Sequence, residues 1–199
     1  MDARQGYAAA ARAFADLVDR LPATSYDGPG LGDWDLRALV GHTARALVTV
    51  RTYLDQPAEE PALDTAADYL TRATGTATDP AAVLERGRAA GAALGEAPAA
   101  SVRALVGEVL AKVADFGDGY VLTTVAGPMR LVDYLPTRTF ELVVHGLDIG
   151  RAAGLDPAYP EPVVAQAVAL AGQVAVRTGR GPDLLLALTG RQQLGFSVV

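Results

Sequence analysis

Apolar side chains recur at helical spacing along most of this chain, and this periodicity limits the possible folds more than any other feature. In residues 3–21, Tyr7, Phe14 and Leu21 fall on one helical face, while charged residues lie elsewhere. The same spacing recurs in later segments: about 35–54, 79–96, 101–113, 131–153 and 163–178. We therefore expect a mainly α protein whose four principal helices form a bundle.

Local signals predict where several of these helices begin and end. Asp35 is a candidate N-cap, because its carboxylate can accept from a free N–H of the first turn. Asp79-Pro80 predicts another helix start, with an N-cap followed by proline at the first helical position. Ser101 is expected to cap the next helical piece, and residues 74–78 are expected to end a short helix. Pro136 either marks the true start of the 131–153 helix or kinks it.

Two regions depart from the helical pattern. Residues 120–125 have strand propensity and are followed by a turn at Gly127-Pro128, which predicts a short β element. Residues 184–188 fit either a buried strand or a short helix. At 199 residues we expect one compact domain with a small appendage. We place the bundle at residues 1–153 and a small C-terminal helical or extended region at 154–199.

The composition excludes several classes of function. The formal net charge is −6, which argues against a nucleic-acid-binding protein, because such proteins need a basic face. The chain has no cysteine, so it can supply no disulfide, zinc-thiolate site or thiol nucleophile of its own. The N-terminus lacks a signal-peptide pattern, and no apolar run is long enough to cross a membrane. We therefore expect a cytoplasmic protein without a membrane partner.

The most informative polar pattern lies in the predicted 131–153 helix, where Glu141 precedes His145 by four residues. Side chains at this spacing share one helix face. Two histidines and one carboxylate would suit zinc or another borderline divalent ion, and His42 is the only other histidine. We expect His42, Glu141 and His145 to meet. Acidic residues are common in this chain, so an ordinary helix salt bridge between Glu141 and His145 stays open as an alternative.

Other polar residues are candidates for supporting roles. Arg138 shares the helix face of Glu141 and is expected to orient Glu141, to bind a substrate carboxylate, or to form a plain ion pair. Asp148 is expected to hydrogen-bond a ligand histidine or to face solvent. Arg45, three residues after His42, points either into the site or to the surface. Tyr120 and Tyr134 are candidates for lining the same site, or for ordinary packing positions.

Two segments resemble a known family. The segment from Trp34 to His42 and the segment from Arg138 to Asp148 together are similar to the mycothiol-dependent maleylpyruvate isomerases, within the DinB-like metalloenzyme superfamily. The resemblance implies a DinB-like four-helix bundle and a divalent metal site, most often zinc, with His42, Glu141 and His145 as ligands. It also implies mycothiol as the thiol cosubstrate. Residues 55–115 carry no recognisable motif, and we expect substrate preference to vary there.

The expected function follows from this metal site and the absence of cysteine. The chain would be a metal-dependent mycothiol transferase or isomerase, with a metal-bound thiolate attacking a small electrophilic substrate. One alternative is a metal hydrolase that uses bound water, because the same ligand set serves both reactions. Another is a DinB-like binding or stress-response module without catalysis. The sequence is compatible with a monomer or a homodimer.

Overall fold

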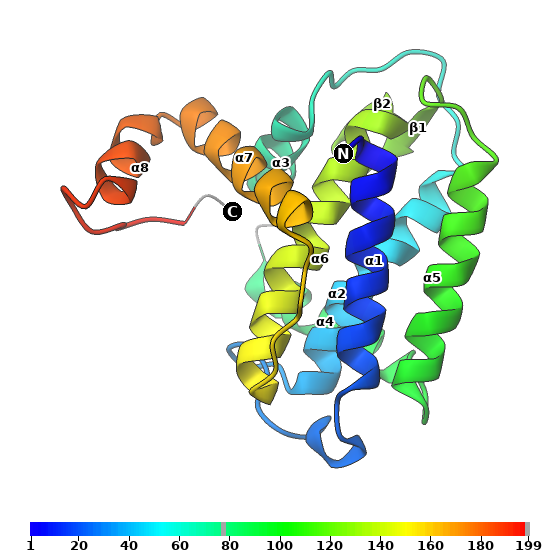
Figure 1. Ribbon diagram of the computed structural model, residues 1–199. Coiled ribbons are helices and arrows are strands. Elements are labelled where there is room, and N and C mark those ends of the chain that lie inside the picture. The colour runs from blue at the N-terminus through cyan, green and yellow to red at the C-terminus, as the bar shows by residue number, and fades with distance from the viewer. Residues whose placement is uncertain (77–78, 198–199) are drawn as a thin grey trace.

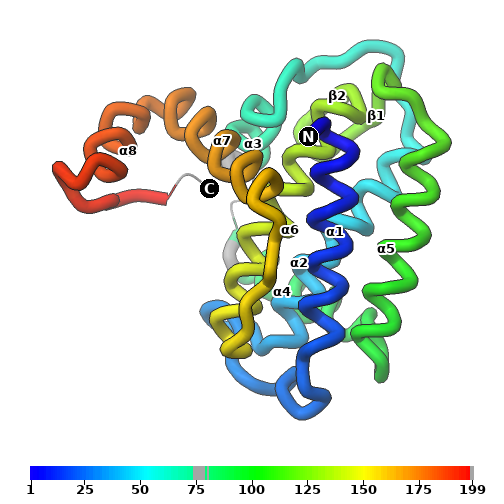
Figure 2. Tube along the Cα trace, in the orientation of Figure 1, coloured from blue at the N-terminus to red at the C-terminus, as the bar shows by residue number. Residues whose placement is uncertain are grey.

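The computed structural model describes residues 1–76 and 79–197, with the side chains of 74–76 and 80 outside that description (Figures 1 and 2). The described chain is mainly helical, as predicted. Four helices form the bundle: α1 (Ala3–Asp19), α2 (Leu36–Tyr53), α5 (Pro98–Ala114) and α6 (Leu131–Ala153). Helices α1 and α2 each pack against both α5 and α6. The bundle's interior is filled by large, fully buried side chains, including Tyr7, Phe14, Leu39, Leu47 and Leu135.

The connection from α2 to α5 carries two further helices, α3 (Ala66–Thr76) and α4 (Pro80–Ala92). Helix α4 lies against α2, and the two backbones approach closely where Gly41 meets Gly91. A Cβ at Gly41 would overlap the backbone of Gly91, so the crossing requires glycine. This close contact places α4 along the end of α2 that carries His42.

A two-stranded antiparallel hairpin precedes α6 and confirms the predicted β element. Strands β1 (Val121–Thr124) and β2 (Gly127–Arg130) pair so that Leu122 lies opposite Met129, and both side chains are fully buried. Gly127 has a φ of 127°, which a residue with a Cβ rarely adopts. The hairpin runs directly into α6 and so fixes where that helix begins.

The C-terminal part forms two helices, α7 (Glu161–Arg177) and α8 (Gly181–Leu188). Helix α7 packs on α1, α3 and α6, whereas α8 contacts α7 and extends away from the bundle (Figure 1). Residues 184–188 are therefore helical. On α8, Leu185 is 65% exposed and Leu188 is 72% exposed, so the buried strand considered for this segment is excluded.

One local prediction was wrong, and two others are narrowed by the structure. Helix α5 begins at Pro98, and Ser101 is not its N-cap; the Ser101 hydroxyl donates to the Leu94 carbonyl at the end of the preceding segment. Proline is favoured at the first helical position, which moves the start ahead of the serine. Helix α3 is described as far as Thr76, inside the stretch 74–78 that was expected to end it, and residues 77–78 lie outside the described residues. Pro136 lies inside α6, which excludes the alternative that it marks the start of this helix.

The predicted caps at Asp35 and Asp79 are confirmed. The Asp35 carboxylate accepts from the backbone N–H of Ala38 at 2.7 Å, and the Asp79 carboxylate accepts from that of Ala81 at 2.9 Å. Each carboxylate satisfies one of the N–H groups that an isolated helix start leaves free. Both signals are local, which explains why the sequence was sufficient to predict them.

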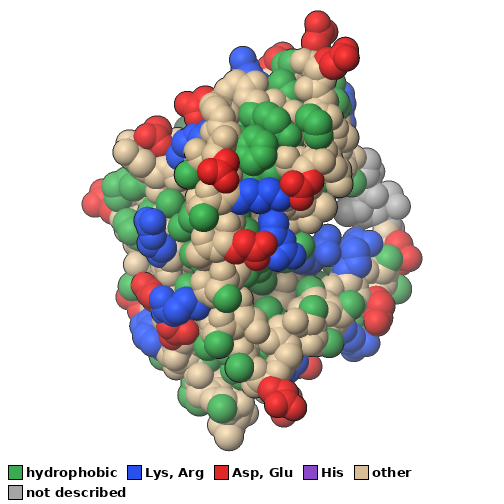
Figure 3. All heavy atoms as spheres, turned by 90° about the vertical axis from the view of Figure 1, so that its right-hand side faces the viewer, with side chains coloured by type: hydrophobic (Ala, Val, Ile, Leu, Met, Phe, Trp, Pro, Cys, Tyr) green, Lys and Arg blue, Asp and Glu red, His purple; other side chains and the backbone are tan. Residues whose placement is uncertain are grey.

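The surface carries charges of both signs. On the face shown in Figure 3, acidic, basic and apolar side chains are interspersed. Several ion pairs join helices across the surface, among them Arg51 with Glu108 at 3.0 Å and Lys112 with Asp55 at 2.6 Å. Within the part of the chain that the structure describes, no helix is both long and apolar enough to span a membrane.

Candidate metal centre

Helix α6 presents Glu141 and His145 on one face, one turn apart. Glu141 Oε2 lies 3.3 Å from His145 Nε2, and both side chains are largely buried. The pair alone is what an ordinary helix salt bridge would give. The feature that distinguishes it is a third donor, which comes from another helix.

His42 of α2 completes the group. Its ring centroid lies 4.8 Å from that of His145, and the rings meet edge to face. Nitrogen or oxygen ligand atoms of His42, Glu141 and His145 all lie within 4.8 Å of one another. The structure therefore brings together the three residues that the sequence nominated, and their donor set of two imidazoles and one carboxylate is one that zinc and similar ions accept.

The Trp34 ring packs against the His42 ring. The two ring centroids are 4.4 Å apart, and the Trp34 indole N–H donates to the Leu84 carbonyl of α4 at 3.0 Å. Gly87 makes room for the indole, because a Cβ there would overlap it. Trp34 is thus a packing residue, and it also limits how the His42 ring can turn.

The protonation state of His42 fits a metal ligand. Burial, with a further contribution from the neighbouring His145, lowers the pKa of His42 to about 4. At neutral pH its imidazole is therefore uncharged and retains a free lone pair. Its Nδ1 atom is buried and has no hydrogen-bond partner among the described residues. Buried polar atoms are normally paired, so a buried imidazole nitrogen without a partner favours a site that a ligand completes.

In the absence of a metal ion, Glu141 and His145 stabilise each other's charged forms. Burial raises the pKa of Glu141, but the hydrogen bond from His145 and the charge of Arg138 outweigh burial and hold it at about 2. Burial lowers the pKa of His145, but hydrogen bonds to Asp148 and Glu141 outweigh it and raise the value to about 9. A divalent ion bound here would therefore have to replace a proton on His145.

The predicted supporting residues lie around this group. Asp148 Oδ2 lies 3.3 Å from His145 Nδ1, on the side of the ring away from Glu141. At metal sites a ligand histidine commonly donates one ring N–H to such a carboxylate, which orients the other ring nitrogen toward the metal. Arg138 lies one turn before Glu141, with its Nη2 atom 3.8 Å from Glu141 Oε1. Arg45 lines the cavity that His42 also lines.

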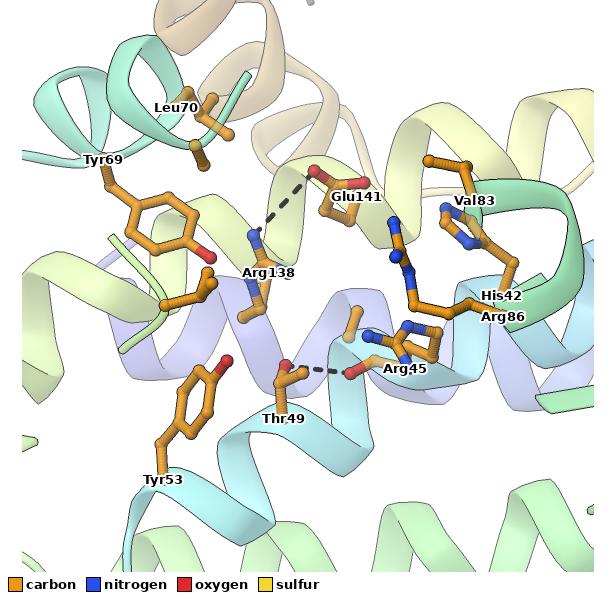
Figure 4. A pocket seen from close by; sticks show the side chains of 13 residues that line it. His42, Arg45, Thr49, Tyr53, Tyr69, Leu70, Val83, Arg86, Arg138 and Glu141 are labelled. Carbon is orange, nitrogen blue, oxygen red and sulfur yellow. Dashed lines mark hydrogen bonds and ion pairs between the residues drawn. The ribbon is translucent and has the colours of Figure 1, made fainter. Parts of the chain in front are cut away.

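A cavity of about 270 Å³ opens beside His42 and Glu141 (Figure 4). Its walls come from α2, α3, α4 and α6, with Val125 added from the turn between β1 and β2. The lining residues that the sequence did not nominate are Ala46, Thr49, Tyr53, Tyr69, Leu70, Ala73, Val83, Arg86 and Val125. Five of these lie within residues 55–115, where no motif is visible. Helical packing brings them to the site, so no local signal could have identified them.

The two tyrosines proposed for this cavity lie elsewhere. Tyr134 is fully buried and is not among the residues that line the cavity, and its hydroxyl donates to Thr49 Oγ1 at 3.1 Å. The Tyr120 hydroxyl donates to the Leu54 carbonyl at 2.8 Å. Both have the ordinary packing roles that were the alternative expectation, because each hydroxyl finds a partner within the fold.

One further tyrosine holds the helix that carries the group. Tyr159, in the segment after α6, donates from its hydroxyl to the Leu142 carbonyl at 2.5 Å. Gly146 makes this contact possible, because a Cβ at that position would overlap the Tyr159 hydroxyl. The contact lies between the turns that bear Glu141 and His145. No sequence pattern links these residues, so it was not predicted.

The fold and the site together define a four-helix bundle with a His/Glu/His group beside an internal cavity. The protein-family model described as the mycothiol maleylpyruvate isomerase N-terminal domain matches residues 7–150. The chain belongs to this family, as the resemblance in its two motif segments indicated. Comparison with curated proteins and with solved structures gave no significant match.

Proposed function

We propose that this chain is a divalent-metal-dependent mycothiol transferase or isomerase that acts on a small electrophilic substrate. The observation that carries the proposal is the unpartnered, uncharged imidazole of His42 beside Glu141 and His145. Two further facts support it: the chain has no cysteine, and it belongs to a family named for a mycothiol-dependent enzyme. The thiol must then come from outside the chain.

The proposed metal ligands are His42, Glu141 and His145, with zinc as the most suitable ion for this donor set. A bound divalent ion would act as a Lewis acid and lower the pKa of a thiol that reaches it. Three protein ligands leave at least one coordination position open, which is typical of catalytic sites. The cavity beside His42 and Glu141 gives a small molecule access to that position.

The remaining residues prepare the site. Asp148 holds a proton on His145 Nδ1, so that Nε2, which lies beside Glu141, would offer a lone pair to a metal ion that replaces its proton. Tyr159 fixes α6 through the Leu142 carbonyl, so the turns that present Glu141 and His145 keep their orientation. Arg138 and Arg45 contribute positive charge at the cavity wall. The bundle at residues 1–153 contains all of these groups except Tyr159, and we propose that it is the functional unit, with 154–199 as an appended region.

Thiol consumption tests this proposal directly. The purified protein is incubated with mycothiol and a generic electrophile such as a conjugated enone, with and without a chelator. We expect loss of free thiol above the uncatalysed rate, its abolition by the chelator, and its return when zinc is added. Glu141→Gln should abolish activity, whereas Glu108→Gln, which alters an exposed carboxylate of α5, serves as the matched control. Metal-dependent turnover of an ester without thiol would instead favour a hydrolase.

A further inference from the structure

Arg138 is buried at the cavity wall with most of its donors unused. Its side chain is 11% exposed, and its Nε–H donates to Thr137 Oγ1 at 3.0 Å. The nearest carboxylate oxygen, Glu141 Oε1, lies 3.8 Å from Nη2, which is too long for a hydrogen bond. Among the described groups, which leave out the side chains of residues 74–76 and 80, the terminal nitrogens therefore make no hydrogen bond. A buried charged group whose donors make no hydrogen bonds costs folding free energy. We therefore expect a ligand to supply the acceptor.

Two aromatic rings stabilise the charge of Arg138 without accepting hydrogen bonds from its terminal nitrogens. The Arg138 Cζ atom lies 5.2 Å from the ring centroids of both Tyr69 and Tyr134. Aromatic faces stabilise a guanidinium by cation–π attraction, but they do not replace an oxygen acceptor in its plane. Figure 4 shows the Arg138 side chain between Tyr69 and Glu141, facing the space that the lining residues enclose.

The cavity as a whole is positively charged in an acidic protein. Arg45 and Arg86 also line it, and neither side chain has an ion pair or hydrogen bond in the described part of the chain. Glu141 is the only carboxylate among the described lining residues, and under the proposed function its charge is shared with a metal ion. The formal net charge of the whole chain is −6, so the positive charge of the cavity is opposite in sign to the net charge of the protein. Such a cavity concentrates anions.

We propose that Arg138 is the specificity-determining residue of this cavity and that it binds a carboxylate of the electrophilic substrate. A guanidinium edge matches a carboxylate through two parallel N–H···O bonds. Tyr53 lines the same cavity and offers its hydroxyl to the same anion. Arg45 and Arg86 attract it from solvent. The identity of the ligand as the electrophile rests on the proposed function, whereas binding of the anion does not require a metal.

The single tryptophan provides the measurement, because the Trp34 ring centroid lies 4.4 Å from that of His42, which lines the cavity. The protein is titrated with sodium crotonate and, separately, with crotonamide at the same ionic strength, and Trp34 fluorescence is recorded. Crotonate and crotonamide have the same shape and differ in charge. We expect saturable binding of crotonate and binding of crotonamide at least tenfold weaker. We expect Arg138→Gln to weaken crotonate binding at least tenfold, Arg138→Lys to retain part of it, and the surface control Arg130→Gln to leave it unchanged.

Two results would overturn the proposal. One is equal binding of crotonate and crotonamide by the unaltered protein, which decides the question even if Arg138→Gln does not fold. The other is a folded Arg138→Gln variant, verified by circular dichroism, that binds crotonate as before. Calorimetry on His42→Ala separates this proposal from the metal site. If His42→Ala still binds crotonate, the carboxylate binds at Arg138, and this holds even if thiol consumption fails. If crotonate binding is lost in His42→Ala but kept in Arg138→Gln, the carboxylate binds the metal ion and the proposal is wrong.

Discussion

The rings of His42 and His145 meet edge to face with their centroids 4.8 Å apart, although one lies on α2 and the other on α6. Two imidazoles this close cannot both be positively charged without strong repulsion. The structure resolves the conflict by lowering the pKa of His42 and raising that of His145. At neutral pH we therefore expect a neutral His42 and a positively charged His145. A metal ion that binds here would displace one proton from His145.

Metal binding should therefore become tighter as pH rises. His145, with a pKa raised to about 9 in the metal-free protein, must lose its proton, whereas His42 is already neutral at pH 7. Below pH 9 the apparent affinity for zinc should increase about tenfold per pH unit, with about one proton released per ion. Calorimetry in buffers of different ionisation enthalpy measures that number. An affinity that does not change between pH 6 and pH 8 would contradict the assigned protonation states.

The stability of the metal-free protein should show the opposite dependence. The pKa of His145 is raised above its usual value of 6.5, because the imidazolium lies between Glu141 and Asp148. Its contribution is complete below about pH 6.5 and is lost as pH rises through about 9. Urea unfolding with a chelator present should therefore show a decrease in the free energy of unfolding over that interval. In His145→Gln this decrease should be absent, and a decrease of the same size would exclude His145 as its source.

Asp148→Asn should weaken zinc binding without unfolding the protein. The substitution keeps the size of the side chain but removes the charge that holds the Nδ1 proton of His145. Loss of such a supporting carboxylate typically costs about 10- to 100-fold in metal affinity. Competition with a chromogenic chelator measures the change. Asp133→Asn, which alters a carboxylate of the same helix paired with Arg130, is the control and should leave the affinity unchanged.

Gly146→Ala should destabilise the protein through Tyr159. A Cβ at Gly146 overlaps the Tyr159 hydroxyl, so we expect a loss of about 1–3 kcal/mol in the free energy of unfolding, as for other overpacked sites. Gly172→Ala in α7 is the matched control, because a Cβ there meets nothing within 4 Å and alanine favours helix. In Tyr159→Ala the same glycine substitution should cost less. Equal costs in both backgrounds would show that Tyr159 does not occupy that space.

The parts of this fold that depend on local sequence were predictable. The caps at Asp35 and Asp79 involve a carboxylate and an N–H two or three residues away, so composition and spacing were sufficient. The i, i+4 spacing of Glu141 and His145 is equally local. His42 joined them in the prediction because the chain has only one other histidine and its segment resembles a known motif.

The parts that depend on packing between distant segments were not predictable. Ser101 has the composition of a cap, yet its hydroxyl bonds the Leu94 carbonyl, because Pro98 already starts the helix. Tyr69 and Arg86 reach the cavity only because α3 and α4 lie against the bundle. The contact of Tyr159 with Gly146 likewise needs the chain to turn back after α6. In each case the partner is fixed by the tertiary arrangement, which a single sequence does not display.

The central claim, that His42, Glu141 and His145 bind one metal ion, is tested most directly by the metal content of the purified protein. Inductively coupled plasma mass spectrometry after dialysis against zinc should give about one ion per chain. His42→Ala and His145→Ala should each lower the content well below that value while circular dichroism shows an intact helical fold. Full metal occupancy in both folded variants would contradict the account.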